Sequence, residues 1–232
     1  MSSDAIGALP ILCIHNPKSV RRHESILKQF KQVPSLQHNL RFVDAIMASE
    51  LDFASLPITP LARKCILASS KQKTTEPVQF SNLHTDNVGV VGTMMSHAKC
   101  WDRILSSNVP FAIVMEDDAT LAKDFEKTLR RVVEPLMKQH ADQWDVLRIG
   151  GIWDDKPDNA EVTRMGGKRL IWRGHLCNLG YIVSHKGAQI LRENAFPVEM
   201  VSEAYMGTLR DVGLLRMFLL PKPIMIPLAK KN

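Results

Sequence analysis

Two uninterrupted apolar runs of strand length constrain the fold of this chain more than any other feature. Leu9–Ile14 and Phe111–Met115 contain only apolar residues, and both are shorter than a typical helix. Such runs suit strands that are buried on both faces, as in a parallel sheet covered by helices. The sequence therefore predicts an α/β fold with a mixed, mainly parallel sheet.

Helical spacing alternates with these strand-like segments along the chain. Asn16 and Pro17 follow the first run and form a helix start signal, after which Val20–Val33 keeps roughly helical apolar spacing. Further strands are expected at Leu40–Ala45, Trp144–Ile149, Arg169–Trp172, Gly180–Ser184, Phe218–Leu220 and Ile224–Ile226. Further helices are expected at Leu61–Ser69, Thr93–Ser106, Phe125–Leu136 and Lys186–Asn194.

The length of 232 residues and the absence of repeats or linkers favour a single domain over 1–232. The stretch 46–88 carries several prolines and polar clusters, and we expect most of it to be a long loop or insertion. Its short helix is the exception.

The chain has 30 Lys and Arg against 24 Asp and Glu, a formal net charge of +6. A basic surplus is compatible with nucleic acid, an anionic membrane face or a phosphate-bearing ligand. The basic residues are scattered and only 6% of residues are aromatic, so a nucleic-acid module is not expected. A solvated surface, diphosphate binding and peripheral membrane contact remain as alternatives.

The four cysteines are far apart in the sequence and form no C-x-x-C pair. This spacing fits neither a zinc site nor a dense disulfide framework, and it suits a reducing compartment. The first apolar run is too short for a signal peptide, and no stretch approaches the ~20 apolar residues of a membrane span. The expected location is the cytoplasm, with the membrane surface as an alternative.

Three consecutive acids end the second apolar run: Glu116, Asp117 and Asp118. In an open α/β sheet, ligands sit beyond the carboxyl ends of the strands. Alternate residues of an extended segment face the same way, so Glu116 and Asp118 can present two carboxylates to one site. Hard oxygen ligands suit Mg²⁺ or Mn²⁺ bound to substrate phosphates. The alternative is that the acids cap a helix near Asp124 or form a solvated turn.

Several segments, in their order and spacing, resemble glycosyltransferase family 25. The resemblance rests on a G-x-x-x-S-H helix before a strand that ends in E-D-D, and it extends from about residue 11 to about residue 226. The segments that carry it are Gly92–Trp101, Ile113–Ala119, Asp145–Gly150, Gly180–Ala188 and Pro197–Glu199, with looser matches at Ile14–Asn16, Arg21-Arg22 and Phe42–Ala45. Glu199 stands where the family pattern has Asp.

The resemblance implies a GT-A-like, Rossmann-type nucleotide-binding domain. It also implies a UDP-sugar donor, galactose as the first choice of hexose, a saccharide or glycoconjugate acceptor, and transfer with inversion. Mn²⁺ or Mg²⁺ is the implied cofactor. Glucose and N-acetylglucosamine stay open as donor sugars.

The resemblance assigns the metal to Glu116 and Asp118, and it assigns Asp117 to ribose or metal. Ser96 and His97 fall in the first turn of the predicted helix, where free backbone N–H groups favour anions, so they are candidates for binding donor phosphates or sugar. Alternatively, Ser96 satisfies the backbone and His97 packs under the sheet.

The nucleotide is expected beyond the first two strands, where the candidates are His15, Asn16, Arg21 or Arg22, and Asp44. Simple helix capping with exposed arginines is the alternative. An inverting transfer also needs a base for the acceptor hydroxyl. The candidates for the base are Asp154, Asp155, Glu199 and Glu203, and those for a further metal ligand are His175 and His185.

Three rival functions remain at this level. The difference at Glu199 leaves room for a catalytically silent relative that binds nucleotide-sugar without transfer. The acidic triplet would also suit another metal-dependent nucleotide-using transferase, such as a nucleotidyltransferase. Net charge alone suggests nucleic-acid binding, which generic electrostatics also explains.

Overall fold

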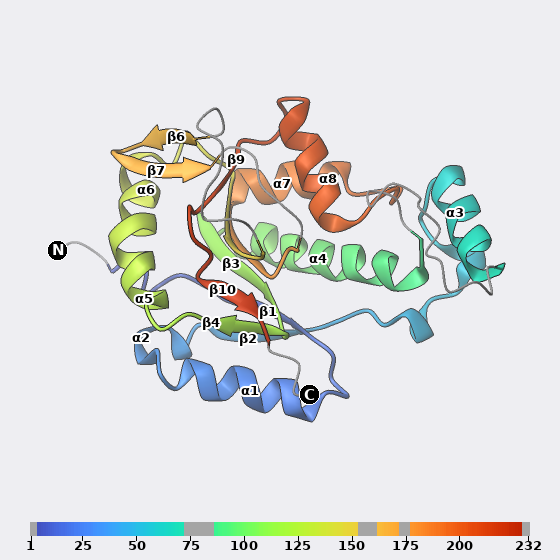
Figure 1. Cartoon of the computed structure of the whole chain (residues 1–232), viewed down its shortest axis with the longest axis horizontal. Helices are drawn as coiled ribbons and strands as arrows, with labels where there is room; N and C mark the ends of the chain where they lie inside the picture. The colour runs from blue at the N-terminus through green and yellow to red at the C-terminus, as the bar shows by residue number, and fades with distance from the viewer. Residues whose placement is uncertain (1–3, 72–85, 153–161, 172–176, 229–232) are drawn as a thin grey trace.

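The computed structural model describes residues 4–71, 86–152, 162–171 and 177–228. One mixed sheet runs through them with the strand order β2-β1-β3-β8-β5-β9-β7-β6, while β10 pairs with β4 and touches β5 (Figure 1). The strands are β1 Ile11–His15, β2 Leu40–Asp44, β3 Phe111–Glu116, β4 Ala119–Leu121, β5 Val146–Gly150, β6 Val162–Met165, β7 Lys168–Ile171, β8 Gly180–Ser184, β9 Met217–Leu219 and β10 Met225–Pro227.

Helices cover both faces of this sheet. They are α1 Val20–Phe30, α2 Pro34–Gln37, α3 Pro60–Lys71, α4 Val88–Ser107, α5 Phe125–Thr128, α6 Glu134–Gln139, α7 His185–Asn194 and α8 Ser202–Asp211. A π-helical turn, Leu129–Val133, joins α5 to α6, and two 3-10 turns lie at Ala48–Glu50 and Phe53–Ser55. Within the described residues, no helix is long and apolar enough to cross a membrane.

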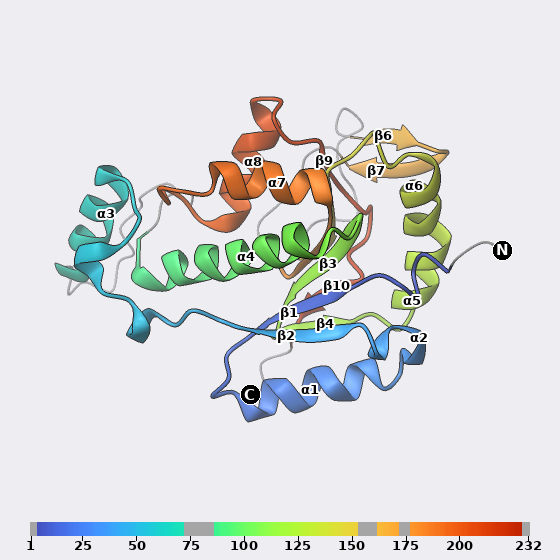
Figure 2. The same cartoon turned by 180° about the vertical axis from the view of Figure 1, so that it is seen from behind.

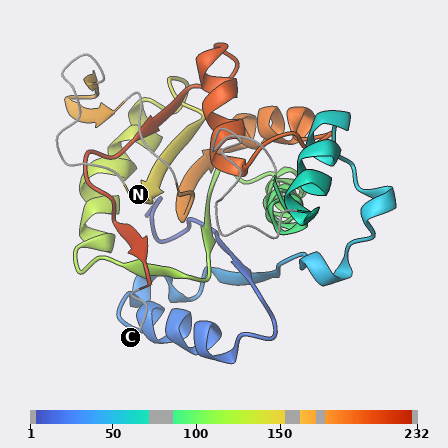
Figure 3. The same cartoon turned by 45° about the vertical axis from the view of Figure 1, so that its right-hand side comes forward.

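Alternation along the buried strands separates two cores. Ile113 and Met115 of β3 face one core with α1, α2, α5 and α6, whereas Ala112 and Val114 face the other with α4, α7 and α8. Figure 2 shows α1 and α4 on opposite sides of the first three strands, and Figure 3 looks nearly along α4 and shows the same separation. The predicted α/β class with buried strands is confirmed, and the arrangement is consistent with a GT-A-like fold.

The direction of the strands is mainly parallel, as predicted. β1 pairs in parallel with β2 on one side and β3 on the other, and β5 pairs in parallel with β9. β8 lies antiparallel between β3 and β5. The chain adds β2 on one side of β1 and then returns to add β3 on the other side, while all three strands run in the same direction. The order of strand addition therefore reverses at β1, and such a switch point opens a crevice at the carboxyl ends of the strands.

Several element boundaries differ from the predicted ones. The largest difference is in α4, which begins at Val88 and not at Thr93, because the side chain of Asn87 caps the helix by accepting from Val90 N at 3.1 Å. Helix α8, which has ten residues, and the short strands β4 and β6 are not among the predicted elements, since apolar residues do not recur in them at a clear period. The stretch 46–88 contains α3 and the two 3-10 turns, and its residues 72–85 lie outside the described part.

Two glycines in comparable helices provide a test of the packing. A Cβ at Gly187 in the first turn of α7 would lie well inside 3.0 Å of the Asp145 carbonyl oxygen, whereas the nearest atom to a Cβ at Gly207 in α8 is Arg210 Nη2 at 4.0 Å. We expect Gly187→Ala to lower the free energy of unfolding by about 1–3 kcal/mol, because backbone must move. Gly207→Ala is expected to be neutral or to stabilise by up to about 1 kcal/mol. Urea unfolding measures both, and equal losses would contradict this packing.

Candidate functional site

A cleft of about 440 Å³ opens at the switch point of the sheet. Its walls come from the ends of the three parallel strands β1, β2 and β3 and from the first half of α4. The lining residues are Ile14, Asn16, Arg22, Ala45, Ile46, Met47, Ala48, Asn87, Gly89, Val90, Thr93, Ser96, His97, Glu116 and Asp117. The cleft therefore lies where the topology favours a nucleotide.

Asp117 is the acid that holds the loop after β1 in place. It is 5% exposed, and its Oδ2 lies 2.8 Å from His15 Nδ1 and accepts from Asn16 N at 3.0 Å. Its Oδ1 accepts from Arg22 Nη1 at 2.7 Å. A carboxylate with three such partners is satisfied by the protein itself, so the structure gives Asp117 a structural role that the sequence did not reveal.

Glu116 ends β3 and Asp118 lies in the turn that follows, and both are more exposed than Asp117. Their side chains are 28% and 37% exposed. The Oδ1 atom of Asp118 is buried without a hydrogen-bond partner, and its Oδ2 lies 3.8 Å from Arg22 Nη2. Burial, and then the charge of Glu116, raises the pKa of Asp118 above its ordinary value. Folding therefore gathers negative charge here that Arg22 only partly offsets.

This acid pair fits a divalent cation that also binds a ligand. No group of three or more His, Cys, Asp or Glu side chains in the described part of the chain is arranged to hold a metal ion. Two carboxylates nevertheless suffice for Mg²⁺-type ions that keep several waters and bind substrate phosphates. The unpartnered Asp118 oxygen is the observation that favours such a cation.

The motif Gly92–His97 has a different role from the one predicted. Ser96 and His97 lie in the third turn of α4, not in the first, because the helix begins at Val88. Ser96 Oγ donates to Gly92 O at 2.7 Å and accepts from Ile46 N at 2.8 Å. A Cβ at Gly92 would collide with Ile46 O. Gly92 and Ser96 thus clamp the 45–47 wall of the cleft onto α4.

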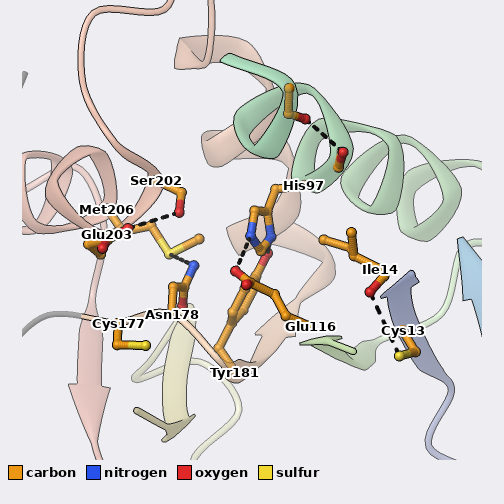
Figure 4. A network of polar contacts seen from close by, with 12 residues as sticks. Cys13, Ile14, His97, Glu116, Cys177, Asn178, Tyr181, Ser202, Glu203 and Met206 are labelled. Carbon is orange, nitrogen blue, oxygen red and sulfur yellow. Dashed lines mark hydrogen bonds and ion pairs between the residues drawn. The ribbon is translucent and has the colours of Figure 1, made fainter. Parts of the chain in front are cut away.

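His97 is fully buried behind the acid pair. Its Nε2 lies 3.3 Å from Glu116 Oε1, and its Nδ1 lies 3.1 Å from Tyr181 Oη. Figure 4 shows the His97 ring facing both of these side chains. Its backbone N–H is inside the helix and is not available to an anion, so the predicted first-turn position is wrong, and the contact of the imidazole on this side is with Glu116.

Only some of the residues predicted to bind the nucleotide line the cleft. Asn16 lines the cleft, whereas His15 is buried against Asp117. Arg22, and not Arg21, reaches the acids, because Arg21 lies on the exposed side of α1. Asp44 ends β2 beside His15, but its side chain is exposed, and it is Ala45 and Ile46 that line the cleft.

The remaining candidates for base and metal ligand divide in the same way. His185 follows β8, and because β8 is antiparallel to β3, Ser184 opposes Phe111 at the edge of the sheet away from Glu116. His185 therefore cannot bind a metal at Glu116 and Asp118. Asp154, Asp155 and His175 lie outside the described residues. Glu199 is partly buried beside Val198, which pairs with Ile58.

A second cluster of polar side chains, to the left of His97 in Figure 4, includes Glu203 at the start of α8. Burial, followed by the charges of Glu116, Glu203 and Asp118, raises the pKa of Cys177 to about 11. Cys177 therefore lies within electrostatic reach of all three acids. Cys177 O accepts from the buried Arg148, and Ser202 Oγ donates to Glu203 Oε2 at 3.2 Å.

One family model and several curated proteins match this chain. A family model described as glycosyltransferase family 25 (LPS biosynthesis protein) matches residues 10–206. Similar curated proteins include the inactive glycosyltransferase 25 family member 3 of Mus musculus, 28% identical over 109 residues, and procollagen galactosyltransferase 1 of Danio rerio, 28% identical over 106 residues. These matches cover 47% and 44% of this chain but only 18% and 17% of the relatives. A third, procollagen galactosyltransferase 2 of Mus musculus, is 27% identical over 108 residues, 44% of this chain and 16% of its own.

The two neighbouring aspartates give opposite stability predictions in the metal-free protein. Asp117→Asn removes the charge paired with Arg22, and we expect a loss of about 1–3 kcal/mol in the free energy of unfolding. Asp118→Asn removes a charge that folding disfavours. Because more than a third of the Asp118 side chain is exposed, solvent screening limits the expected gain to about 1 kcal/mol or less.

The pH dependence of the second effect has a definite sign. A carboxyl whose folded pKa is raised costs stability as the pH rises from the ordinary value of 3.8 through the folded pKa. The Asp118→Asn gain should therefore be full at neutral pH and disappear below about pH 3.8. Thermal melts of both variants and the wild type across this range measure it, and a gain that persists at low pH would contradict the assigned cause.

Proposed function

The chain belongs to glycosyltransferase family 25, and on that premise we propose that it transfers a hexose from a UDP-sugar to a saccharide or glycoconjugate acceptor, with inversion. Family membership implies a sugar donor and an acceptor. Galactose is the proposed hexose because two similar proteins are named procollagen galactosyltransferases. The observation that carries the proposal is the acid pair with its unpartnered Asp118 oxygen beside a cleft at the switch point.

We propose that the cleft binds the nucleotide and that Glu116 and Asp118 hold Mn²⁺ or Mg²⁺ at the diphosphate. A bound divalent ion supplies positive charge to the diphosphate leaving group as the sugar–phosphate bond breaks. Arg22 lies on the same side and adds a fixed cation, while Asp117 keeps the loop after β1 open for the nucleotide.

Glu203 is our preferred base for the acceptor hydroxyl. The charges of Glu203, Glu116 and Asp118 all raise the pKa of Cys177, so Glu203 acts on the same thiol as the two proposed metal ligands. Ser202 Oγ donates a hydrogen bond to one of the Glu203 carboxylate oxygens. Such an acid can take the hydroxyl proton as the acceptor oxygen attacks the anomeric carbon. Glu199, Asp154 and Asp155 remain the alternatives.

A specific observation supports a silent protein as the second candidate function. One similar protein from Mus musculus is named inactive and one from Rattus norvegicus is named probable inactive. A protein of this kind would bind nucleotide-sugar in the same cleft without transferring the sugar.

Nucleotide binding is tested by thermal melting with UDP, UDP-galactose, UDP-glucose and UDP-N-acetylglucosamine, each with and without Mn²⁺. We expect UDP and Mn²⁺ together to raise the Tm more than the sum of their separate effects, because a ligand that binds only the folded state stabilises it. Asp118→Asn should abolish this excess. Asp124→Asn, a change at an exposed acid six residues away, should keep it. A larger shift with a nucleoside triphosphate would instead favour a nucleotidyltransferase.

Transfer is tested by UDP release with Mn²⁺ and a panel of saccharide acceptors. We expect Glu203→Gln to lower kcat by about 10²–10⁴-fold and to leave the UDP-dependent Tm shift intact, because a general base acts only in the chemical step. Glu199→Gln, Asp154→Asn and Asp155→Asn serve as comparisons. If the large loss falls on one of these and not on Glu203→Gln, that residue is the base. Donor binding without turnover would favour the silent protein.

A further inference from the structure

Three buried side chains form a hydrogen-bonded line behind Glu116. Trp101 Nε1 donates to Tyr181 Oη at 2.8 Å, Tyr181 Oη lies 3.1 Å from His97 Nδ1, and His97 Nε2 lies 3.3 Å from Glu116 Oε1. Trp101, His97 and Tyr181 have no exposed surface. Because water is excluded, each of their polar atoms depends on its neighbour in the line.

The position of every proton in this line follows from the chemistry of its first member. An indole N–H can only donate, so the oxygen of Tyr181 accepts at that end. Burial raises the pKa of Tyr181 well above its ordinary value, so the phenol keeps its own proton. Among the described contacts, the acceptor within reach of that proton is His97 Nδ1. His97 Nε2 must then carry the hydrogen and donate it to Glu116.

The alternative proton placements leave a buried group without a partner. If His97 Nδ1 carried a hydrogen, it would point at an oxygen that already accepts from Trp101, and the phenol proton of Tyr181 would lack an acceptor among the described contacts. A buried donor without an acceptor is costly. The arrangement with a neutral His97 protonated at Nε2 satisfies all four residues.

From this geometry we propose that His97, held as the Nε2–H tautomer by Tyr181 and Trp101, is a positioning residue that fixes the Glu116 carboxylate for the cleft. The role rests on the proposed metal site. A neutral donor orients the carboxylate but leaves its full negative charge for a cation, which an imidazolium would offset. Fixing Oε1 also removes the torsional freedom that Glu116 would otherwise lose on binding.

The tautomer is tested without any ligand, so this test does not depend on the proposed function. Long-range ¹H–¹⁵N spectra of the labelled, metal-free protein show which ring nitrogen of each histidine is protonated, and comparison with His97→Gln identifies the His97 signals. We expect Nδ1 to be unprotonated and Nε2 protonated at neutral pH. Protonation at Nδ1, alone or together with Nε2, would overturn the proton assignment.

The positioning role is tested by Mn²⁺ affinity in the presence of UDP, measured by electron paramagnetic resonance. His97→Leu removes the donor, and we expect about 10–100-fold weaker binding. His97→Gln keeps an amide N–H and should recover part of the loss. Tyr181→Phe removes the hydroxyl that fixes His97 as the Nε2–H tautomer, and it should weaken Mn²⁺ binding less than His97→Leu. Circular dichroism and the Tm establish that each variant is folded.

Tyr205→Phe is the matched control, because it also removes a buried phenol hydrogen bond, from Tyr205 Oη to Leu191 O at 2.6 Å, and this bond is not part of the line to Glu116. We expect its Mn²⁺ affinity to equal that of the wild type. An equal loss in Tyr205→Phe and Tyr181→Phe would show a general packing effect and overturn the role. Unchanged Mn²⁺ affinity in His97→Leu would overturn only the positioning role of His97. A wild type that binds no Mn²⁺ in the presence of UDP would overturn the proposed metal site as well.

Discussion

Burial of the central strands on both faces is the constraint on which the rest of this structure depends. Each residue of β1 and the first five of β3 are buried, with alternate side chains facing two separate cores. A sheet of this kind needs helices on both sides, and α1 and α4 supply them from consecutive crossovers. The reversal in the order of strand addition at β1 then opens the cleft. The site is therefore a consequence of how the sheet is covered.

The acidic triplet shows how one short segment divides structural and chemical work. In the turn after β3, Asp117 points inward, where His15, Asn16 and Arg22 satisfy it, while the two acids on either side are more exposed. The inward acid ties the end of β3 to the loop after β1. The pair Glu116 and Asp118 carries charge that Arg22 only partly offsets, which is the property expected of a cation site.

The buried face of α4 extends this organisation away from the cleft. Gly92 and Ser96 hold the 45–47 wall through backbone contacts, and His97 reaches Glu116 from the next position. A single helix thus sets both the wall of the cleft and the orientation of a carboxylate. Tyr181 links the same helix to β8, so the central antiparallel strand also takes part in ordering the site.

The sequence by itself determined the α/β class, the main strands and helices, and the place of the acids at the end of β3, because apolar period and strand alternation are local properties. Tertiary structure decided what each polar residue touches. Arg22 and not Arg21 reaches the acids because of the face of α1 on which each lies. His185 lies far from Glu116 because β8 runs antiparallel to β3. The shift of Ser96 and His97 into the middle of α4 depends on the cap at Asn87, which apolar spacing does not register. Partners distant along the chain, such as Tyr181 for His97, exist only once the sheet has assembled.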